Sequence, residues 1–322
     1  MILNELNNDI IKVVLAADDN YAQHLGVTMV SILENHLSTQ KIEFHILDNN
    51  INSVNIQKIK LIGQKYKVDL FFYLVSSSDL DNYPKHNYLP RSTYLRVLIP
   101  ELLPRAINKV LYLDTDIVVL GDISELYNQG LGDFSLGAVR DIMADEILQI
   151  HFDKNVSNYF NAGVLLLNLE KWRGLRLAEK SFELIRLYGR EIIRADQDIL
   201  NSLFVGDWQP LDKRFNSDLK RSNPSREIEA NTVILHYSDR VKPWQYIFYG
   251  KSQKYYLKYL KMTPWADFNF SDKNFSMYIR KYLRVFILAL KRSLVSFIPN
   301  SLLNIYRKIL WSTYKVNKSK TF

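Results

Sequence analysis

The chain has 322 residues, of which 47% are hydrophobic and 24% charged. This composition is typical of a folded protein and excludes an intrinsically disordered chain. The sequence has no cysteine, which excludes disulfides, thiolate metal sites and cysteine nucleophiles. The net charge is +8, but ten Lys or Arg and no acid lie after Ser276, and removing these from the 42 basic residues leaves 32 against 34 acidic ones. The basic charge therefore belongs to the C-terminal tail.

The sequence predicts no segment that spans a membrane. Its first residues, MILNELNNDI, contain acids and amides where a secretory signal has a basic stretch followed by an apolar one, so we expect no cleaved leader. No window reaches the roughly 18 consecutive apolar residues that cross a bilayer, because Lys291 and Arg292 interrupt the longest candidate. We therefore expect a cytoplasmic protein.

Strands alternate with helices at the start of the chain. Apolar runs predict strands at 11–17, 42–48 and 68–75, and apolar residues at helical spacing predict helices at 26–35 and 54–65. This alternation indicates an α/β fold with a mostly parallel sheet.

Beyond residue 75 the predicted elements are less regular. In chain order we expect a polar loop at 76–91, a helix from Ser92 that ends at Pro100, strands at 109–119, 135–141 and 161–169, helices at 175–189 and 196–206, and an irregular segment at 208–250. The long polar loop is a candidate functional segment.

Two aspartates interrupt the apolar run KVLYLDTDIVV, which begins at Lys109. Asp114 and Asp116 follow a predicted buried strand, and open α/β sheets bind ligands at the carboxyl ends of their strands. Two carboxylates at this spacing can converge on a hard cation such as Mn²⁺ or Mg²⁺, which keeps positions open for phosphate oxygens. The alternative is a pair of turn residues, one capping the chain and one solvated.

The segment VILHYSDRVKPW, from Val233 to Trp244, supplies further candidate groups. His236 follows an apolar, strand-like run and can provide an imidazole that shifts a carboxylate site toward Mn²⁺. Lys242 offers a point charge for phosphate, and Arg240 offers either the same or a solvated surface charge. A structural or surface role is the alternative for the histidine.

Eight segments follow one another between about Val13 and Trp244. They are AADDNYAQHLGVTMVSI, FHILD, STYLRVLIPELLP, KVLYLDTDIVVLGDISELY, YFNAGVLLLNLEKWR, DQDILNSLF, LDKRFN and ILHYSDRVKPW. The series resembles glycosyltransferase family 8, the retaining GT-A enzymes that include lipopolysaccharide and lipooligosaccharide α-galactosyl- and α-glucosyltransferases. The resemblance implies a single Rossmann-like α/β domain with a mostly parallel sheet over residues 1–270, followed by a helical basic tail over 271–322.

The resemblance also assigns roles to individual residues. Those expected to contact a UDP-sugar are Ala16, Asp18, Asn20 and Tyr21 at the nucleoside, Arg96, Asp114, Asn161, Ala162, Asp196 and Gln197 on the sugar side, and Asp116, His236, Asp239 and Lys242 at the diphosphate. Thr115 is expected near the donor only by its position between Asp114 and Asp116. Asp114, Asp116 and His236 correspond to ligands of Mn²⁺, with Mg²⁺ as the alternative ion. Asp141, Asp196 and Gln197 are the candidate catalytic residues. From the residues alone, DDNY also fits a helix cap with a core tyrosine, and Asp196 also fits an N-cap.

The candidate nucleophile position holds Gln197, whose amide is a weak nucleophile. We therefore expect front-face substitution, in which the departing phosphate takes the proton of the acceptor, rather than a covalent intermediate. The sequence departs from the family at one place, because Asp239 replaces the glycine of His-x-x-Gly-x-x-Lys-Pro-Trp. A carboxylate beside a diphosphate adds negative charge, so this departure bears on donor affinity more than on reaction type.

The basic tail is expected to bind a membrane surface. From Met277 to Ile298 the apolar and aromatic residues lie on one side of a helical wheel and Arg280, Arg284 and Lys291 lie on a flank. Pro299 ends this segment, and a second begins at Leu302. Basic amphipathic helices with aromatic residues bind anionic membranes. The alternative is a C-terminal helix that packs on the core.

Together these features predict a retaining hexosyltransferase on the inner face of the cell membrane. It would move galactose or glucose from a UDP-sugar to a glycan or lipid-linked glycan acceptor during synthesis of lipopolysaccharide, capsule or another surface glycoconjugate. The alternatives are a metal-dependent nucleotide-sugar hydrolase and a weak or inactive UDP-sugar-binding protein. Nucleic acid is not an expected partner.

Overall fold

The structure is a computed structural model of the whole chain. It describes residues 10–76, 91–141, 158–188, 192, 194–218, 228–248, 250–270, 272–273, 275, 277–279 and 281–283. The chain divides into two compact units, one of Met1–Pro243 with Gly250–Asn269 and one of Trp244–Tyr249 with Phe270–Phe322. The boundary predicted at residue 270 stays a prediction.

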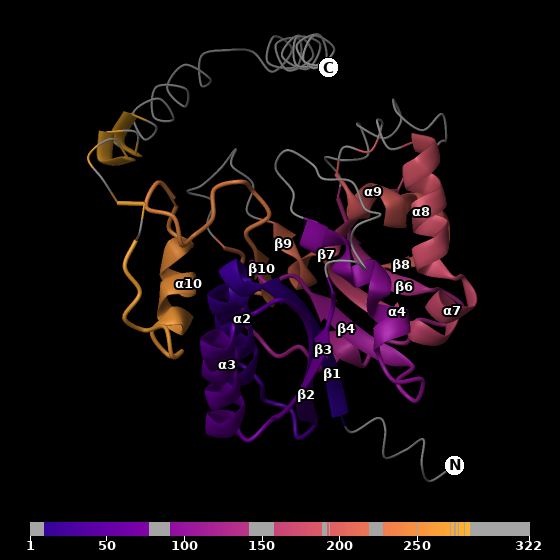
Figure 1. Cartoon of the computed structure of the whole chain (residues 1–322), viewed down its shortest axis with the longest axis horizontal. Helices are drawn as coiled ribbons and strands as arrows, with labels where there is room; N and C mark the ends of the chain where they lie inside the picture. Colours follow the sequence, from indigo (N-terminus) through magenta and orange to yellow (C-terminus); the bar gives the residue numbers. More distant parts are fainter. Residues whose placement is uncertain are drawn as a thin grey trace. The chain divides into compact units, whose positions relative to one another are not determined.

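A seven-stranded sheet in the order β3-β2-β1-β4-β7-β6-β8 forms the centre of the first unit (Figure 1). Its strands are β1 (Ile10–Asp18), β2 (Lys41–Asn49), β3 (Asp69–Leu74), β4 (Lys109–Leu113), β6 (Leu136–Arg140), β7 (Phe160–Asn168) and β8 (Trp208–Pro210). Neighbouring strands are parallel except at β7, which is antiparallel to both β4 and β6. The expected α/β fold with a mostly parallel sheet is confirmed, and β7 places its first residues beside the carboxyl end of β4.

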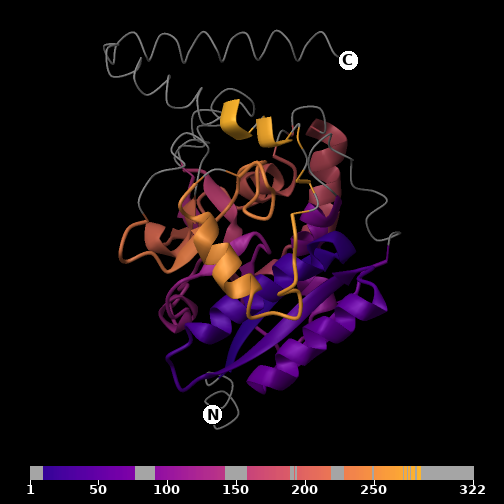
Figure 2. The ribbon, with the colours of Figure 1, turned by 90° about the vertical axis from the view of Figure 1, so that its left-hand side faces the viewer.

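Helices cover both faces of this sheet (Figures 1 and 2). Those on one side are α2 (Ala22–Glu34), α3 (Ser53–Tyr66) and α10 (Gln253–Leu260), and those on the other are η4 (Arg91–Leu98), α4 (Ile99–Leu102), α7 (Leu169–Gly174), α8 (Leu177–Tyr188) and α9 (Asp196–Leu203). The second group encloses a core in which Tyr94, Leu165, Trp172 and Phe204 are fully buried. Burial of such large apolar side chains is the main source of stability of the unit.

The predicted strand at 109–119 is two strands in different sheets. β4 ends at Leu113, and β5 (Ile117–Val119) belongs to a three-stranded sheet with β10 (Ile234–His236) and β9 (Ser217–Asp218). β5 pairs antiparallel with β10, which puts His236 opposite Ile117. The interruption by the two aspartates is therefore the place where the chain passes from one sheet to the other.

Three other predicted elements differ from the structure. The helix expected from Gly26 begins at Ala22, after a 3-10 turn η2 (Asp19–Tyr21). Pro100 lies in the first turn of α4 instead of ending a helix, because a first-turn residue has no intrahelical N–H bond to lose. The irregular segment at 208–250 contains β8, β9, β10 and the short helix η5 (Lys213–Phe215), elements too short to show a hydrophobic period.

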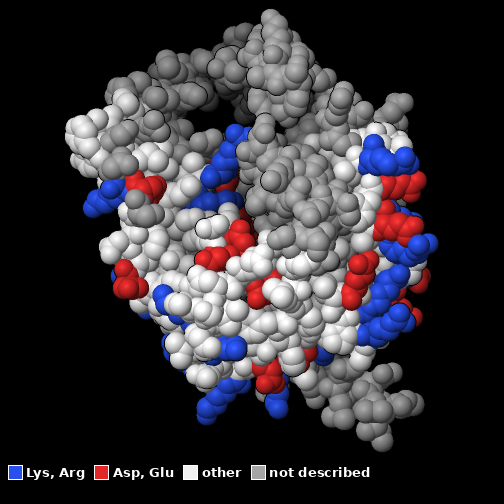
Figure 3. Space-filling view, in the orientation of Figure 1, with Lys and Arg blue, Asp and Glu red and all other residues white. Residues whose placement is uncertain are grey.

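No helix of the described residues is long and apolar enough to cross a membrane. On the face seen in Figure 3, Lys and Arg side chains alternate with Asp and Glu side chains over α7 and α8. In the second unit, the Tyr246 N–H donates to Asp272, and Phe275, Tyr278 and Tyr282 are exposed. Residues 277–279 and 281–283 are helical, and the remainder of the predicted tail helices lies outside the described residues.

Candidate active site

Three side chains from two distant parts of the chain, Asp114 and Asp116 on one and His236 on the other, meet where β4, β5 and β10 come together. His236 Nε2 lies 3.2 Å from Asp116 Oδ1 and 3.9 Å from Asp114 Oδ2. One ligand atom from each of the three residues lies within 4.8 Å of the other two. The structure thus brings together all three predicted metal ligands.

Backbone hydrogen bonds hold these residues in place. The Asp114 N–H donates to the carbonyl of Gly163 on β7 at 2.9 Å, and the Tyr237 N–H donates to the carbonyl of Asp116 at 3.0 Å. Because the first bond joins two strands of the central sheet and the second joins the turn to β10, the position of each ligand is set by sheet pairing rather than by a free loop.

Arg96 lies behind the carboxylates and links two of them. Its Nη2 is 2.8 Å from Asp114 Oδ1, its Nε is 2.7 Å from Asp196 Oδ2, and its Nη1 donates to the carbonyl of Ala162. Burial lowers the pKa of Arg96, but Asp114 and Asp196 outweigh it, so the net pKa is raised and the guanidinium stays charged. The Tyr112 hydroxyl also donates to Asp114 Oδ1, at 2.7 Å. Oδ1 of Asp114 is therefore occupied by protein, and Oδ2 faces the histidine.

Lys242 contacts the same site. Its Nζ donates to Asp116 Oδ2 at 2.6 Å and to the Tyr237 carbonyl at 2.7 Å. Burial raises the pKa of Asp116, but Lys242 and then His236 outweigh it and hold that pKa well below its usual range. For His236 burial acts in the opposite direction and lowers the pKa, because it also disfavours the charged form. Asp116 and Asp114 raise this pKa by more, so the net pKa of His236 is raised. The site is thus built to keep negative charge next to positive charge.

These residues fit a divalent cation. Asp116 Oδ1 is buried and accepts no well-directed hydrogen bond from the described residues, although His236 Nε2 is 3.2 Å away. A buried carboxylate oxygen without a hydrogen bond is costly, and a cation shared with the imidazole would satisfy both atoms. Two carboxylates and one imidazole form a donor set suited to Mn²⁺, with Mg²⁺ less favoured by the nitrogen.

Sequence reasoning missed three residues of the site: Tyr112, Gly163 and Asn216. A Cβ on Gly163 would lie 2.3 Å from His236 Cε1 and 2.8 Å from Asp114 Oδ2, so only glycine fits there. Asn216 Oδ1 lies 2.9 Å from His236 Nδ1. A glycine inside a strongly apolar strand was a signal for a close approach, whereas nothing in the sequence places Asn216 or Tyr112 beside the ligands.

At the predicted nucleoside end, the turn after β1 is held by its own aspartates. Asp18 Oδ1 accepts from the Tyr21 N–H at 3.1 Å, which is the helix-cap alternative for this segment. Asp19 accepts from the N–H of Asn52 at 2.9 Å and from both side-chain amides of Asn52 and Asn55 at 2.8 Å. Burial first, and then the charges of Asp116, Asp18 and Asp114, raise the pKa of Tyr21. The charges of the predicted metal ligands therefore act on the Tyr21 hydroxyl, which is consistent with a turn at the border of the site.

The predicted sugar side is also assembled. Ala195 is the N-cap of α9 and makes no side-chain cap bond, so Asp196 is not a cap and its carboxylate pairs with Arg96 instead. Gln197 Oε1 accepts from the Ala162 N–H at 3.1 Å. Asp141 is buried and pairs with Arg194 Nη1 at 2.8 Å.

The other predicted donor residues have varied surroundings. Thr115 is buried and its carbonyl lies 3.3 Å from Thr28 Oγ1. Ala16 is half-buried and Asn20 is exposed. Asp239 is half-buried, and its Oδ1 lies 2.6 Å from the Arg240 N–H. Their donor contacts stay predictions.

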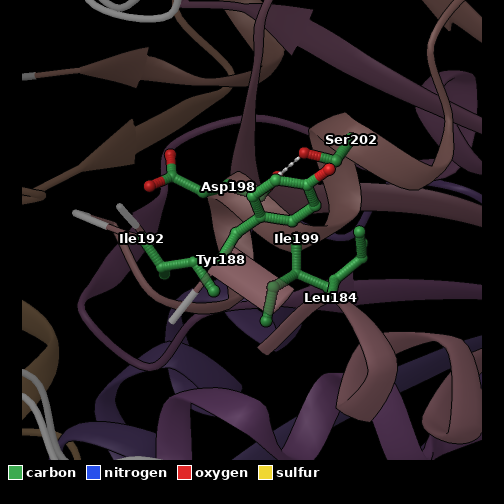
Figure 4. A pocket seen from close by; sticks show the side chains of 6 residues that line it. All are labelled: Leu184, Tyr188, Ile192, Asp198, Ile199 and Ser202. Atoms are coloured by element: carbon green, nitrogen blue, oxygen red, sulfur yellow. Dashed lines mark hydrogen bonds between the residues drawn. The ribbon is translucent and has the colours of Figure 1, made fainter. Parts of the chain in front are cut away.

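A separate small pocket lies between α8 and α9 (Figure 4). Its lining residues are Leu184, Tyr188, Ile192, Asp198, Ile199 and Ser202. The Asp198 carboxylate accepts from the Tyr159 hydroxyl at 2.6 Å and from the Arg194 N–H at 2.8 Å. None of the predicted site residues lines this mostly apolar pocket, so we assign it no role in the chemistry.

The seven-stranded, mostly parallel sheet, the Asp-x-Asp turn after β4 and the histidine of β10 that faces this turn define a GT-A glycosyltransferase. Galactosyltransferase LgtC, solved in complex with donor and acceptor sugar analogues, has the same fold with a TM-score of 0.71 at 30% identity, covering 79% of this chain and 96% of that one. The sequence of residues 12–248 matches Glycosyl transferase family 8. The chain belongs to this family.

Bacterial relatives cover most of this chain. General stress protein A of Bacillus subtilis is 28% identical over 273 residues, which are 80% of this chain and 96% of that protein. Lipopolysaccharide 1,2-glucosyltransferase of Escherichia coli K12 is 28% identical over 272 residues, 81% of this chain and 80% of that protein. The similarity therefore extends over about four-fifths of this chain.

Proposed function

We propose that this glycosyltransferase moves galactose or glucose from a UDP-sugar to a glycan acceptor in surface-glycan synthesis, with retention of configuration. The convergence of Asp114, Asp116 and His236 beside Lys242 carries the proposal. The Escherichia coli relative is named a lipopolysaccharide glucosyltransferase and LgtC a galactosyltransferase, which supports a hexose donor and a glycan acceptor.

Different residues of the site would bind the metal, the diphosphate and the nucleoside of the donor. Asp114 Oδ2, Asp116 and His236 Nε2 would hold Mn²⁺ or Mg²⁺, which supplies Lewis-acid stabilisation of the departing diphosphate. Lys242, with Nζ 2.6 Å from Asp116 Oδ2, is placed to pair with the same diphosphate. The η2 turn would bind the nucleoside, where the Tyr21 ring offers a stacking surface.

The contacts on the sugar side favour front-face substitution. Asp114 and Asp196 both pair with Arg96, and a carboxylate bound to a buried guanidinium is a poor nucleophile. Gln197 uses its amide oxygen to accept from Ala162. We therefore propose that no protein carboxylate attacks the sugar. The leaving phosphate, and no protein carboxylate, receives the acceptor proton while these residues hold the sugar.

A panel of UDP-sugars with and without Mn²⁺ tests this function. We expect metal-dependent turnover of UDP-galactose or UDP-glucose and a product with the anomeric configuration of the donor. Phosphate products formed without a sugar acceptor would instead indicate a nucleotide-sugar hydrolase. UDP binding without any turnover over long incubation would indicate an inactive binding protein, for which Asp239 is the sequence signal.

We also propose that the tail attaches the enzyme to the inner face of the cell membrane. Two observations support this proposal. The sequence after Ser276 contains ten basic residues and no acid, and Phe275, Tyr278 and Tyr282, near the start of the tail, are exposed. Each basic residue near an anionic surface contributes about 1 kcal/mol. The full chain should therefore sediment with anionic vesicles, release with salt, and bind zwitterionic vesicles at least about tenfold more weakly. Equal binding to both vesicles, or preference for DNA, would contradict the proposal.

A further inference from the structure

A chain of buried hydrogen bonds runs from the backbone of β7 to the predicted metal ligand His236. The Gly163 N–H donates to Asn161 Oδ1 at 2.9 Å. Asn216 Nδ2 donates to the same Asn161 oxygen at 2.9 Å, and Asn216 Oδ1 lies 2.9 Å from His236 Nδ1. Asn161, Asn216 and His236 are all buried. The three side chains thus form one continuous path with a backbone amide at its start.

That backbone amide sets the direction of every bond in the path. A backbone N–H can only donate, so the atom of Asn161 that faces it must be the amide oxygen. The atom of Asn216 that faces this oxygen must then be its NH₂ group, and the remaining Asn216 atom must be oxygen. Neither amide can be flipped without placing two donors or two acceptors against each other.

The direction of the path decides which nitrogen of His236 carries the proton. Because Asn216 presents an acceptor, Nδ1 is the ring nitrogen that donates to it and keeps its proton there. Nε2 faces Asp116 Oδ1 at 3.2 Å and Asp114 Oδ2 at 3.9 Å, which are also acceptors, so its proton is the one that a cation bound between these atoms would replace. The bond to Asn216 therefore holds on Nδ1 the proton that a ring bound to a metal through Nε2 has to keep.

We propose that Asn216 is a positioning residue that fixes His236 as the Nδ1–H tautomer, with Asn161 and the Gly163 amide setting its polarity. This inference rests on the proposed metal-dependent function, but the tautomer can be measured without the metal. Asn216 would act through the imidazole and would not itself touch the donor. Partners of this kind are worth about 10–100-fold in metal affinity.

The test uses the metal-free full chain labelled with ¹⁵N at histidine, at a pH high enough for a neutral ring. The chain has six histidines, and His236 is assigned from the signal that is lost in His236→Gln. We expect the wild-type ring to carry its proton on Nδ1, and Asn216→Leu to shift it toward Nε2 or a mixture. Mn²⁺ binding measured by calorimetry should fall about 10–100-fold in Asn216→Leu.

Two further variants keep the test decisive. Asn216→Asp loses the donor to Asn161 Oδ1 and should be less stable, but it retains an acceptor for Nδ1 and should keep the Nδ1–H tautomer, which provides a second readout beside the leucine variant. Asn35→Ala removes a distant amide that bonds Ser31, Val119 and Tyr259, and should lower stability without changing the tautomer.

Two results would overturn the inference: a neutral wild-type His236 protonated on Nε2, or an Asn216→Leu protein that keeps both the Nδ1–H tautomer and the wild-type affinity. If the wild type binds no Mn²⁺ yet shows the Nδ1–H ring, the proposed metal-dependent function fails while the role of Asn216 stands.

Discussion

Asp116→Asn is expected to lower UDP-sugar turnover by roughly 100-fold or more, the range seen when one group that stabilises transition-state charge is lost. Asp116 is both a predicted metal ligand and the acceptor of the Lys242 ammonium at 2.6 Å. The amide has the same size as the carboxylate but no charge, so it would weaken the hold on the cation and release Lys242. Initial rates at saturating Mn²⁺ and UDP-sugar, together with calorimetric Mn²⁺ binding, measure the effect.

Asp122→Asn is the matched control for this variant. Asp122 accepts from the N–H groups of Leu37, Ser38 and Ser124 in a turn outside the site. Its replacement should lower stability but leave turnover unchanged. Wild-type turnover in Asp116→Asn would remove the metal assignment, and equal losses in both variants would indicate a general structural effect.

Gly163→Ala should give the second largest effect, because the new methyl group would lie 2.3 Å from His236 Cε1 and 2.8 Å from Asp114 Oδ2. Neither ligand is free to retreat, since Asn216 holds the histidine and Arg96 holds the aspartate. We expect Mn²⁺ affinity to fall about 10–100-fold and the free energy of unfolding to fall by about 1–3 kcal/mol. Calorimetry and denaturant unfolding measure the two quantities.

Gly121→Ala separates a local clash from the general cost of replacing glycine. A Cβ at Gly121 meets its nearest neighbour, Val233, at 3.6 Å, which is ordinary contact. This variant should keep wild-type metal affinity and change the free energy of unfolding by less than about 0.5 kcal/mol. If Gly163→Ala behaves like Gly121→Ala, the close packing of Asp114 and His236 against β7 does not contribute to Mn²⁺ affinity.

Much of the fold could be predicted from local patterns. The strands β1, β2 and β3 and the helix α3 were identified within about two residues, because the strands are apolar runs bounded by polar residues and the helix has apolar residues at helical spacing. The division of 109–119 into β4 and β5 was not predicted, since the apolar residues on both sides of the aspartates look like one strand. Which sheet a segment joins depends on its partners, and those lie far away in the sequence.

The same holds for the site. The residue types of Asp114, Asp116, His236 and Lys242 were evident from the sequence, and the resemblance to family 8 connected them. Their number and chemistry, and the concentration of basic charge in the tail, follow from the order of residues along the chain.

Only the tertiary structure decided how these groups work together. It placed His236 across from the aspartates by pairing β5 with β10, put Gly163 where a side chain cannot fit, and brought Asn216 behind the imidazole. The physical reason is that steric exclusion and hydrogen-bond direction act between atoms a few ångströms apart, while a sequence pattern reports only the properties of neighbours along the chain.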